Sequence, residues 1–412
     1  MCISVLVMLL SAMLLPLSVS GQTPITMWLY AASQSVTDWA KSFEEQFNKD
    51  NPDIKLEIVT SGSRGNAARE QLLVATVAGV GPDIWSDSTN LTGTHYINNI
   101  TVPIDQYFSQ MDGAADFLPD VLEYVRINGH LHGLPVQMYP FFEVYNLELF
   151  EKSAVSLPNN WEQLLSAVRK LTRVEGTKVT QFGYTLNTRT TIHFGQYLLD
   201  YTTAIGPPFM DAVSPEINLN TPINRMAFTH MKELFDAGMQ GVPSSTWKSA
   251  FGNQAAIQAA VTSRELLNDM PNYSVALKPV LGPQVGQEAI RTNGHTLYLT
   301  TNSKEPEKAW RVMEAFAQPD NMTQYALLTG VYPVRRSTLV RPEVLAGPYA
   351  RELIGLFQYK SANSAVNPYF NEVREAIGME LHRGITGELS VHTALAEAER
   401  VAKAILADKV KN

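Results

Sequence analysis

In the first part of the chain, segments with the hydrophobic spacing of a β-strand alternate with segments that have the spacing of a helix. Residues 25–30 form a short run rich in β-branched and aromatic side chains, and residues 54–59 alternate between apolar and polar positions, as half-buried strands do. The segment between them repeats large apolar side chains every four residues, at Trp39, Phe43 and Phe47, as one face of a helix does. We expect this helix to be capped at Ser35. A second helix is predicted over 66–78. This order of strands and helices predicts a mostly parallel sheet covered by helices.

The stretch at 79–90 joins the second helix to a third predicted strand. Two glycines and a proline end the helix and set a tight turn, residues 84–85 are apolar, and polar side chains follow at 87–90. In open α/β sheets, ligands bind at the carboxyl ends of strands. We therefore expect Trp85 and Asp87 to face a ligand. The alternative is that Trp85 packs in the core and Asp87 caps the next helix.

The middle of the chain is richer in helical patterns. An Asn-Gly pair at 128–129 between apolar residues predicts a β-hairpin, and residues 136–146 after it have the composition of an extended, aromatic strand. Four further features are predicted in this region: helices that begin near Asn160, Phe194 and Pro222, a strand at 181–186, a small and apolar run at 251–260, and an irregular segment at 275–286.

The last third of the chain again shows a strand pattern followed by a helix pattern, as the first hundred residues do. Residues 292–301 predict a strand, and Pro306 fits the first position of a helix because that position needs no backbone N–H donor. A final helix is predicted over 391–407, with apolar residues along one side: Val391, Leu395, Ala398, Val401 and Ile405.

Composition and charge narrow the class of protein. The 412 residues, 45% of them hydrophobic, are enough for two domains with their own cores. The net charge of −8 has no basic cluster to offset it, which argues against nucleic acid and an anionic membrane surface as partners. Residues 1–21 are uncharged and combine a short apolar run with small residues, which predicts a signal peptide. The only cysteine, Cys2, lies inside it.

Five stretches follow one another in an order that is typical of a known family. They are the first-helix pattern at 39–54, Gly-Pro-Asp-Ile at 81–84, Gly-Leu-Pro at 133–135 with Tyr-Asn at 145–146, the small-residue turn and helix that begins at 251–256, and the return at 293–310 with 330–335. Together they resemble the extracellular solute-binding proteins of family 1, the maltose-binding-protein-like carbohydrate receptors of ABC importers.

The resemblance implies an α/β protein with the two-lobed periplasmic-binding-protein fold (type II-like), each lobe a mostly parallel sheet flanked by helices. The lobes are expected at 22–137 plus 294–335 and at 138–293 plus 336–412, joined by hinge strands. Such a protein, expected as a monomer in the periplasm or at the cell surface, captures a sugar or sugar-like solute and delivers it to the transmembrane subunits of an ABC permease. It performs no chemistry and uses no cofactor or metal.

A sugar-binding cleft needs aromatic platforms for ring faces and planar hydrogen-bonding side chains for hydroxyls. Tyr30, Trp85 and Tyr139 could pack in a lobe interior instead. Asp87 could cap the next helix, and Arg264 could form a surface salt bridge. The candidate ligand-binding residues are Tyr30, Trp85, Asp87, Tyr139, Trp247, Arg264, Asn293, Gly294 and Tyr332.

Other interpretations of the chain remain open. A secreted carbohydrate-active enzyme, a glycosidase or lyase, would need paired carboxylates such as Asp87 and Glu143, although the sequence contains no nucleophile-elbow, zinc-protease or phosphate-loop motif. Arg264 leaves open a binding protein for a phosphorylated polyol. The pair His130 and His132 could ligate a metal if a third ligand arrived, but exposed histidines on a hairpin are the simpler explanation. An adhesion or scaffold protein is a further alternative.

Overall fold

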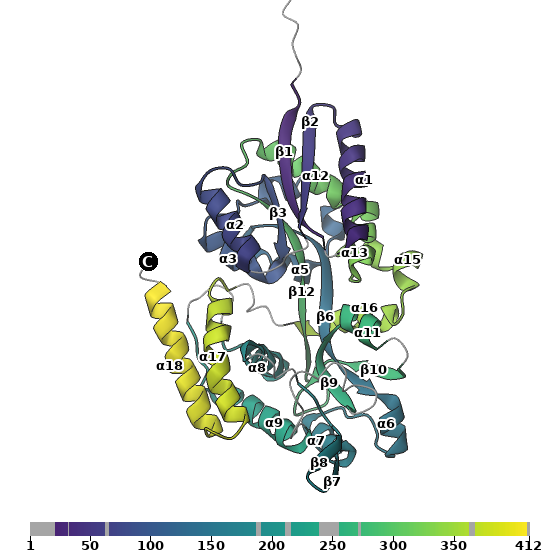
Figure 1. Ribbon diagram of the computed structural model, residues 1–412, viewed down its shortest axis with the longest axis vertical. Helices are drawn as coiled ribbons and strands as arrows, with labels where there is room; N and C mark the ends of the chain where they lie inside the picture. The colour runs from purple at the N-terminus through teal and green to yellow at the C-terminus, as the bar shows by residue number, and fades with distance from the viewer. Residues whose placement is uncertain are drawn as a thin grey trace, which may run out of the picture.

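The computed structural model describes residues 21–409 except 32, 62–65, 187–190, 211–215, 239–254, 271–272 and 362–366. Its elements gather in two groups, an upper one around β1 to β3 and a lower one rich in helices (Figure 1). We call these groups the first and the second lobe. Two long strands, β6 (Leu134–Asn146) and β12 (Glu288–Leu299), run from one lobe into the other. The predicted signal peptide lies, except for its last residue, outside the described residues.

The first lobe is built on three parallel strands. These are β1 (Thr23–Tyr30), β2 (Ile54–Ser61) and β3 (Ile84–Ser88), which lie side by side in the order β2-β1-β3. The helices that connect them are α1 (Gln34–Asp50) and α2 (Asn66–Val77). The predicted alternation of strands and helices is therefore confirmed here, and parallel pairing brings the carboxyl ends of all three strands to one edge.

Helix α1 buries the predicted face but begins earlier than predicted. Phe43 and Phe47 are buried, and the ring of Trp39 stacks on Phe43 with centroids 5.6 Å apart. The N-cap is Ser33, whose Oγ accepts a hydrogen bond from the Val36 amide at 3.4 Å, and not Ser35. A cap needs extended backbone, and the chain is already helical from Gln34 onward, so Ser35 lies inside the first turn.

The sheet continues through both lobes and is mixed. Its strand order is β10-β6-β12-β3-β1-β2, and β12 runs antiparallel to both β3 and β6. In the second lobe, β6 is also antiparallel to β9 (Ile257–Thr262) and β10 (Val275–Lys278). Two short strands join β12: β11 (Val280–Leu281) and β13 (Lys360–Ser361). Parallel pairing of long strands is thus confined to the first lobe.

Helices cover the second lobe, and all of the long ones except α17 are predicted from the sequence. They are α7 (Trp161–Leu171), α8 (Ile192–Ile205), α9 (Pro222–Gly238), α17 (Phe370–Ile385) and α18 (Val391–Lys409). Helix α17 packs between α18 and α8 (Figure 1). On α18 the predicted positions Leu395 and Ala398 are buried, but Val391, Val401 and Ile405 are only half-buried. The other buried positions are Ala394, Ala402 and Leu406.

Three segments of the second lobe differ from the prediction. In 181–186 a regular strand ends at Gln181, and only Phe182 and Thr185 make isolated bridges further along. The described part of 251–260 runs into strand β9, so the turn and helix expected there are wrong for that part. The segment 275–286, expected to be irregular, contains β10 and β11. All three errors involve backbone pairing with partners distant in sequence, which local patterns do not reveal.

Two further predictions are confirmed. The Asn-Gly hairpin is present, with Asn128 and Gly129 both at positive φ as a type I′ turn requires. Helix α12 begins at Pro306 as predicted.

The remaining elements are short or peripheral. These elements are η1 (Thr89–Leu91), α3 (Thr92–Ile97), α4 (Asp105–Phe108), η2 (Ala114–Asp116), α5 (Pro119–Glu123), β4 (Arg126–Ile127), β5 (His130–Leu131), α6 (Leu147–Lys152), β7 (Arg173–Glu175), β8 (Lys178–Gln181), α11 (Ser263–Asp269), α12 (Pro306–Phe316), α13 (Pro319–Thr329), α14 (Arg336–Leu339), α15 (Pro342–Leu345), α16 (Ala350–Gly355) and η4 (Leu356–Gln358).

The described residues form two large hydrophobic cores. One centres on the first-lobe sheet and its helices and extends along β6 to Val261 on β9 and Leu266 on α11, and the other lies among the helices of the second lobe. The predicted residue boundaries of the lobes stay a prediction, and Leu339, Val344 and Leu353, which lie beyond the predicted boundary at 335, pack in the first core. Among the described residues, no helix has the length and apolar character that crossing a bilayer requires.

Candidate functional site

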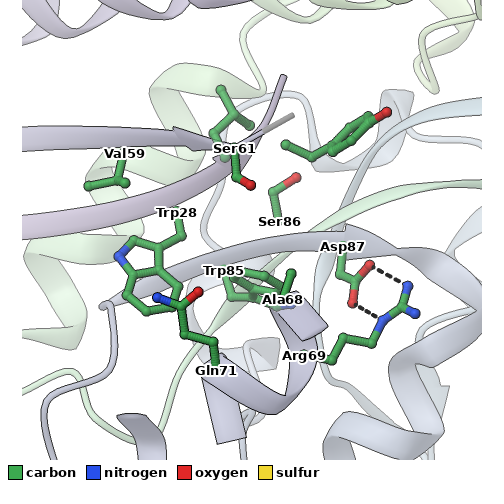
Figure 2. Close-up of a pocket in the computed structure, with 11 residues that line it drawn as sticks. Trp28, Val59, Ser61, Ala68, Arg69, Gln71, Trp85, Ser86 and Asp87 are labelled. Carbon is green, nitrogen blue, oxygen red and sulfur yellow. Dashed lines mark hydrogen bonds and ion pairs between the residues drawn. The ribbon is translucent and has the colours of Figure 1, made fainter. Parts of the chain in front are cut away.

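A cavity of about 250 Å³ lies at the carboxyl ends of β1, β2 and β3. Trp28, Tyr30 and Trp85 line it, and the two indoles meet edge to face with ring centroids 6.0 Å apart (Figure 2). Trp85 is only 8% exposed, because it also packs with Ile100 and Tyr298 in a small cluster. Its two predicted roles therefore coincide: one side of the indole belongs to a core and another borders the cavity.

Asp87 is held in this wall by two cationic or polar partners. Its carboxylate accepts hydrogen bonds from Arg69 Nε at 2.9 Å and Nη2 at 3.1 Å, and lies 3.2 Å from His95 Nε2 (Figure 2). Burial alone would raise the pKa of Asp87, but the hydrogen bonds from His95 and Arg69 lower it well below its usual value. The carboxylate caps no helix, so that alternative is wrong; instead it fixes Arg69 at the border of the cavity.

A larger cavity of about 630 Å³ lies between the two lobes. The first lobe contributes Arg69 and Ser88, and the long strand β12 contributes residues 291–293. The second lobe contributes side chains of α8 and of the start of α17. Because Arg69 lines both cavities, they meet at its side chain. The result is one polar cleft with an indole-lined recess on the first-lobe side.

Asn293 joins three strands at the floor of the cleft. Its Nδ2 donates to Ser88 Oγ at 3.1 Å and to Tyr139 Oη at 3.2 Å, and its Oδ1 accepts from the Asn90 amide at 3.3 Å. Next to it, a Cβ atom on Gly294 would lie 2.0 Å from the Gln137 carbonyl oxygen. The predicted residues Tyr139, Asn293 and Gly294 are thus brought together at the crossing of β6 and β12.

Three guanidinium groups of the described residues line the same cleft, and sequence patterns pointed to none of them. Arg69 pairs with Asp87, and Arg291 donates to the buried Asp200 at 3.0 Å while lying over the Phe141 ring. The third, Arg374 on α17, forms no hydrogen bond or ion pair with the described residues, and its Nε is buried without a partner. Burial and the nearby charge of Arg291 lower the pKa of Arg374 to about 10, so it is a cation at neutral pH.

The first turns of α17 were missed because their helical pattern is ordinary. Asn371 and Glu372 also line the cleft, and their buried atoms Nδ2 and Oε2 have no hydrogen-bond partner in the described part of the chain. Polar atoms in such positions are rare in folded proteins. An available signal was the density of charged and amide side chains in 371–375, but nothing in the sequence tells which face of that helix meets the first lobe.

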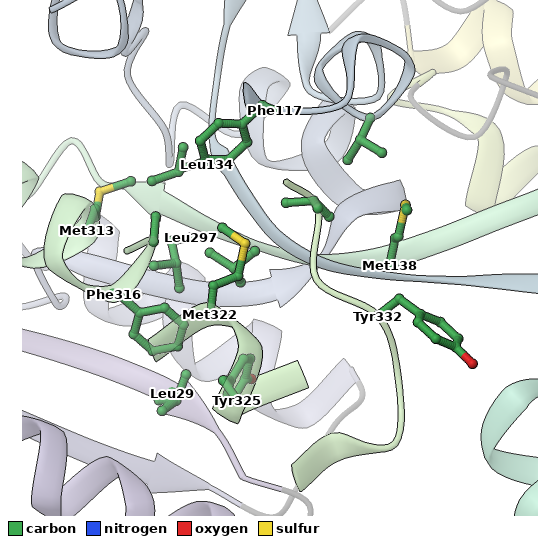
Figure 3. Close-up of a cluster of buried hydrophobic side chains, with 14 of the residues drawn as sticks. Leu29, Phe117, Leu134, Met138, Leu297, Met313, Phe316, Met322, Tyr325 and Tyr332 are labelled. Carbon is green, nitrogen blue, oxygen red and sulfur yellow. The ribbon is translucent and has the colours of Figure 1, made fainter. Parts of the chain in front are cut away.

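The other predicted site residues lie elsewhere. Arg264 Nε and Nη2 both donate to the Thr329 carbonyl oxygen, at 3.3 Å and 2.7 Å, and the residue lines neither cavity. Tyr332 pairs with Met138 through its backbone, and its ring lies at the edge of the first core with the hydroxyl pointing away from that core (Figure 3). Trp247 lies outside the described residues.

The geometry does not favour the enzyme alternative. Glu143 is fully buried in the second lobe, where it accepts hydrogen bonds from Tyr184 at 2.6 Å and Tyr145 at 2.7 Å, and it lines neither cavity. Asp87 and Glu143 therefore do not flank a common space, as the two carboxylates of a glycosidase must.

The predicted metal alternative rests on two histidines of the hairpin. His130 is exposed near Asp105, whereas His132 is buried against Tyr96, so the two do not share the exposed setting that the sequence suggested. Among the residues that the structure describes, no group of three or more His, Cys, Asp or Glu side chains is placed to hold a metal ion.

Comparison with known proteins relates the chain to one family and one fold. A family model for bacterial extracellular solute-binding proteins matches residues 43–348. A relative from Brucella abortus (strain 2308), whose name says only that it is a binding protein, is 24% identical over 338 residues, covering 77% of each chain.

Solved structures share the whole architecture. The sugar-binding protein MalE from Xanthomonas citri superposes with a TM-score of 0.78 at 19% identity, covering 94% of this chain and 98% of that one. An ABC transporter solute-binding protein from Agrobacterium radiobacter K84, in complex with ribitol, has a TM-score of 0.70 at 18% identity, covering 93% and 98%. At such identities the likeness shows the fold, and that fold is two-lobed.

Proposed function

The chain belongs to the family of bacterial extracellular solute-binding proteins, and on that premise we propose that it captures a sugar or polyol in the cleft between its lobes. The observation that carries the proposal is the cleft itself. It is built from both lobes and from β12, it measures about 630 Å³, and ligand sites commonly fall in the range of about 300–1,000 Å³. The sugar-bound and polyol-bound relatives of the same fold support the ligand class.

In the proposed site, each wall has a distinct role. Tyr30 and Trp85 supply apolar faces against which a sugar ring can stack. Asn293 and Ser88 supply hydrogen-bonding groups on the floor, and the start of α17 closes the site from the second lobe. Trp247 remains a predicted second-lobe platform. Arg264 and Tyr332, which line neither cavity, are not part of this proposed site.

The proposal for the biological setting is supported by the family. We propose that the protein is exported by the predicted signal peptide, acts in the periplasm or at the cell surface as a monomer, and passes its ligand unchanged to the transmembrane subunits of an ABC permease. The family and the structural neighbours are binding proteins and not enzymes. That this chain is itself without catalytic activity is part of the proposal.

A ligand panel tests the proposal directly. Thermal unfolding of the mature protein is measured with sugars, oligosaccharides and polyols, each in excess, because a ligand at 100 times its dissociation constant stabilises the folded state by about 2.7 kcal/mol. Compounds that raise the melting temperature are then titrated by calorimetry against wild type, Asn293→Ala and the control Asn98→Ala.

We expect at least one compound to bind, Asn293→Ala to weaken its binding, and Asn98→Ala to leave it unchanged, because Asn98 lies outside both cavities. A panel in which no compound binds contradicts the proposal. Chromatography of the incubated ligand provides a second check, since the appearance of cleavage products would favour the enzyme alternative.

A further inference from the structure

Of the three arginines that line the cleft among the described residues, two are paired with a carboxylate and one is not. Arg69 and Arg291 are each matched by a buried carboxylate within hydrogen-bond distance, Asp87 and Asp200. Arg374 lines the same cavity and has no such partner among the described residues. A cation taken out of water without a counter-charge is costly to the folded state. The cleft therefore holds one guanidinium whose partner the described residues do not supply.

The position of Arg374 is built into the packing of two helices. Gly195 on α8 leaves room for it: a Cβ atom there would lie 3.2 Å from Arg374 Cγ and 3.3 Å from its carbonyl oxygen. The guanidinium carbon also lies 5.7 Å from the centre of the Phe370 ring. Close helix packing thus restrains the backbone and the base of the side chain, while the guanidinium borders the cavity.

Two carboxylates of α17 also line the cavity, and neither forms an ion pair with Arg374. The side chain of Glu375 is exposed to solvent, and its charge raises the pKa of Arg374 by less than burial and Arg291 lower it. The Glu372 atom Oε2 is buried and has no donor among the described residues. A carboxylate accepts hydrogen bonds from hydroxyl groups, whereas a guanidinium binds planar or tetrahedral oxyanions with two parallel N–H donors.

From this arrangement we infer that the solute carries an anionic group, a carboxylate or a phosphate, that binds Arg374, while its hydroxyl groups bind Glu372 and Asn371. The ligand class is an acidic sugar or a phosphorylated sugar or polyol. This inference rests on the proposed function and narrows it. The predicted phosphate alternative rested on Arg264, whose guanidinium donates to the Thr329 carbonyl oxygen. Among the described residues, the guanidinium that lines the cleft without an ion pair is that of Arg374.

Matched ligand series test the inference with the mature wild-type protein. Each series contains a neutral sugar or polyol, its carboxylate form and its phosphate form, with inorganic phosphate measured alone, and binding is read by melting temperature and calorimetry. We expect an anionic member to bind about 10- to 100-fold more tightly than its neutral counterpart, as hydrogen bonds to charged groups allow. Comparison of the carboxylate and phosphate forms identifies which anion is preferred.

Variants assign the preference to Arg374. Arg374→Gln should remove the advantage of the anionic form and leave the neutral form nearly unchanged, and Arg374→Lys should keep more of the advantage for phosphate than for carboxylate. Arg383→Gln is the matched control, because Arg383 lies on the same helix, pairs with Glu380 and Glu388, and does not line the cavity.

The outcomes separate this inference from the proposed function. If neutral members bind as tightly as anionic ones, or if Arg374→Gln weakens both forms equally, the inference is wrong and the proposed function stands. If no member of any series binds, the proposed function fails and the inference fails with it. The wild-type comparison decides the ligand class even if a variant does not fold.

Discussion

At the scale of single residues, two buried carboxylates are held in opposite ways. Asp87 has Arg69 and His95 within hydrogen-bond distance, so its pKa is lowered and it stays ionised. Glu143 has tyrosine hydroxyls around it and, among the residues described, no cation in hydrogen-bond contact. Burial raises its pKa to about 7, although Tyr184 and Tyr145 donate hydrogen bonds to it. The first is a fixed charge in the wall of the cleft, and the second is a group that titrates near neutral pH inside a core.

Glu143 predicts a measurable pH dependence of stability. Its pKa is raised from 4.5 to about 7 on folding. The contribution of protonated Glu143 to the free energy of unfolding is therefore fully present below about pH 4.5 and is lost as the pH rises through about 7. In Glu143→Gln, which cannot ionise, the fall in the free energy of unfolding between about pH 5 and pH 8 should be smaller than in wild type, by at most on the order of 3 kcal/mol.

Urea denaturation of both proteins across this pH range measures the difference. The control is Glu57→Gln, at an exposed position of β2, which should follow the wild-type curve. A Glu143→Gln curve parallel to wild type would show that Glu143 does not change its protonation on folding.

At the scale of elements, the crossing of β6 and β12 is the feature on which the site depends. The two strands pair antiparallel from Arg291 opposite Phe141 onward, with an irregular register between His295 and Thr296. Gly294 lets the strands approach so closely that a Cβ atom would overlap the Gln137 carbonyl. Asn293, the residue before it, then reaches both Tyr139 and Ser88. Gly294, which lines neither cavity, can therefore position a residue that lines the cleft.

Gly294→Ala should damage both stability and the site. The added methyl group must displace the backbone of β6, and overpacking of this kind costs about 1–3 kcal/mol. The free energy of unfolding should fall by that amount in chemical denaturation, and the affinity for any ligand found in the panel should fall as well.

The matched control is Gly355→Ala, where φ is −60° and no atom lies within 4 Å of the added Cβ. This control should be neutral or slightly stabilising, because alanine restricts the unfolded chain. Equal stability of Gly294→Ala and wild type would mean that the strands can separate at no cost.

At the scale of the whole molecule, two cores are connected chiefly by long strands and the chain segments next to them. The first core and the second core are separate clusters of buried residues, and β6 and β12 extend from one to the other. Lobes that pack separately and share few connections move by hinge bending around bound ligands in proteins of this kind. A polar cleft at their junction is then the place where ligand binding and closure are coupled.

Closure can be measured with two labels, since the only natural cysteine lies in the predicted signal peptide. Val77→Cys on α2 and Met379→Cys on α17 are exposed, at 83% and 54%, and lie in different lobes. With spin labels on both, ligand should shorten the measured distance.

A pair within the first lobe, Leu327→Cys on α13 with Val77→Cys, should show no change on ligand addition and serves as the control, because both positions are exposed and neither lines a cavity of the proposed site. A constant distance between the lobes at saturating ligand would contradict closure.

Local patterns were sufficient wherever one segment's own periodicity determines its structure. The parallel strands at the start of the chain, the Asn-Gly hairpin and the helix at Pro306 were all predicted, since turn chemistry and amphipathic spacing act over a few residues. The order of such segments was also enough to recognise the family. Two of the predicted aromatic residues, Tyr30 and Trp85, were found at a cavity because strand ends of a parallel sheet must meet at one edge.

Contacts between side chains that lie far apart in the chain could not be predicted from the sequence. The chain by itself determined which segments are strands and helices in the first lobe, and which strand ends could meet a ligand. Only the tertiary structure decided that Asp87 faces Arg69, that Arg264 donates to a backbone carbonyl, and that Arg374 lines the cleft with no ion-pair partner among the residues described. The physical reason is that burial and charge pairing depend on which faces of separate elements meet, and residues far apart in the sequence, such as Arg69 and Arg374, meet in one cavity only after folding.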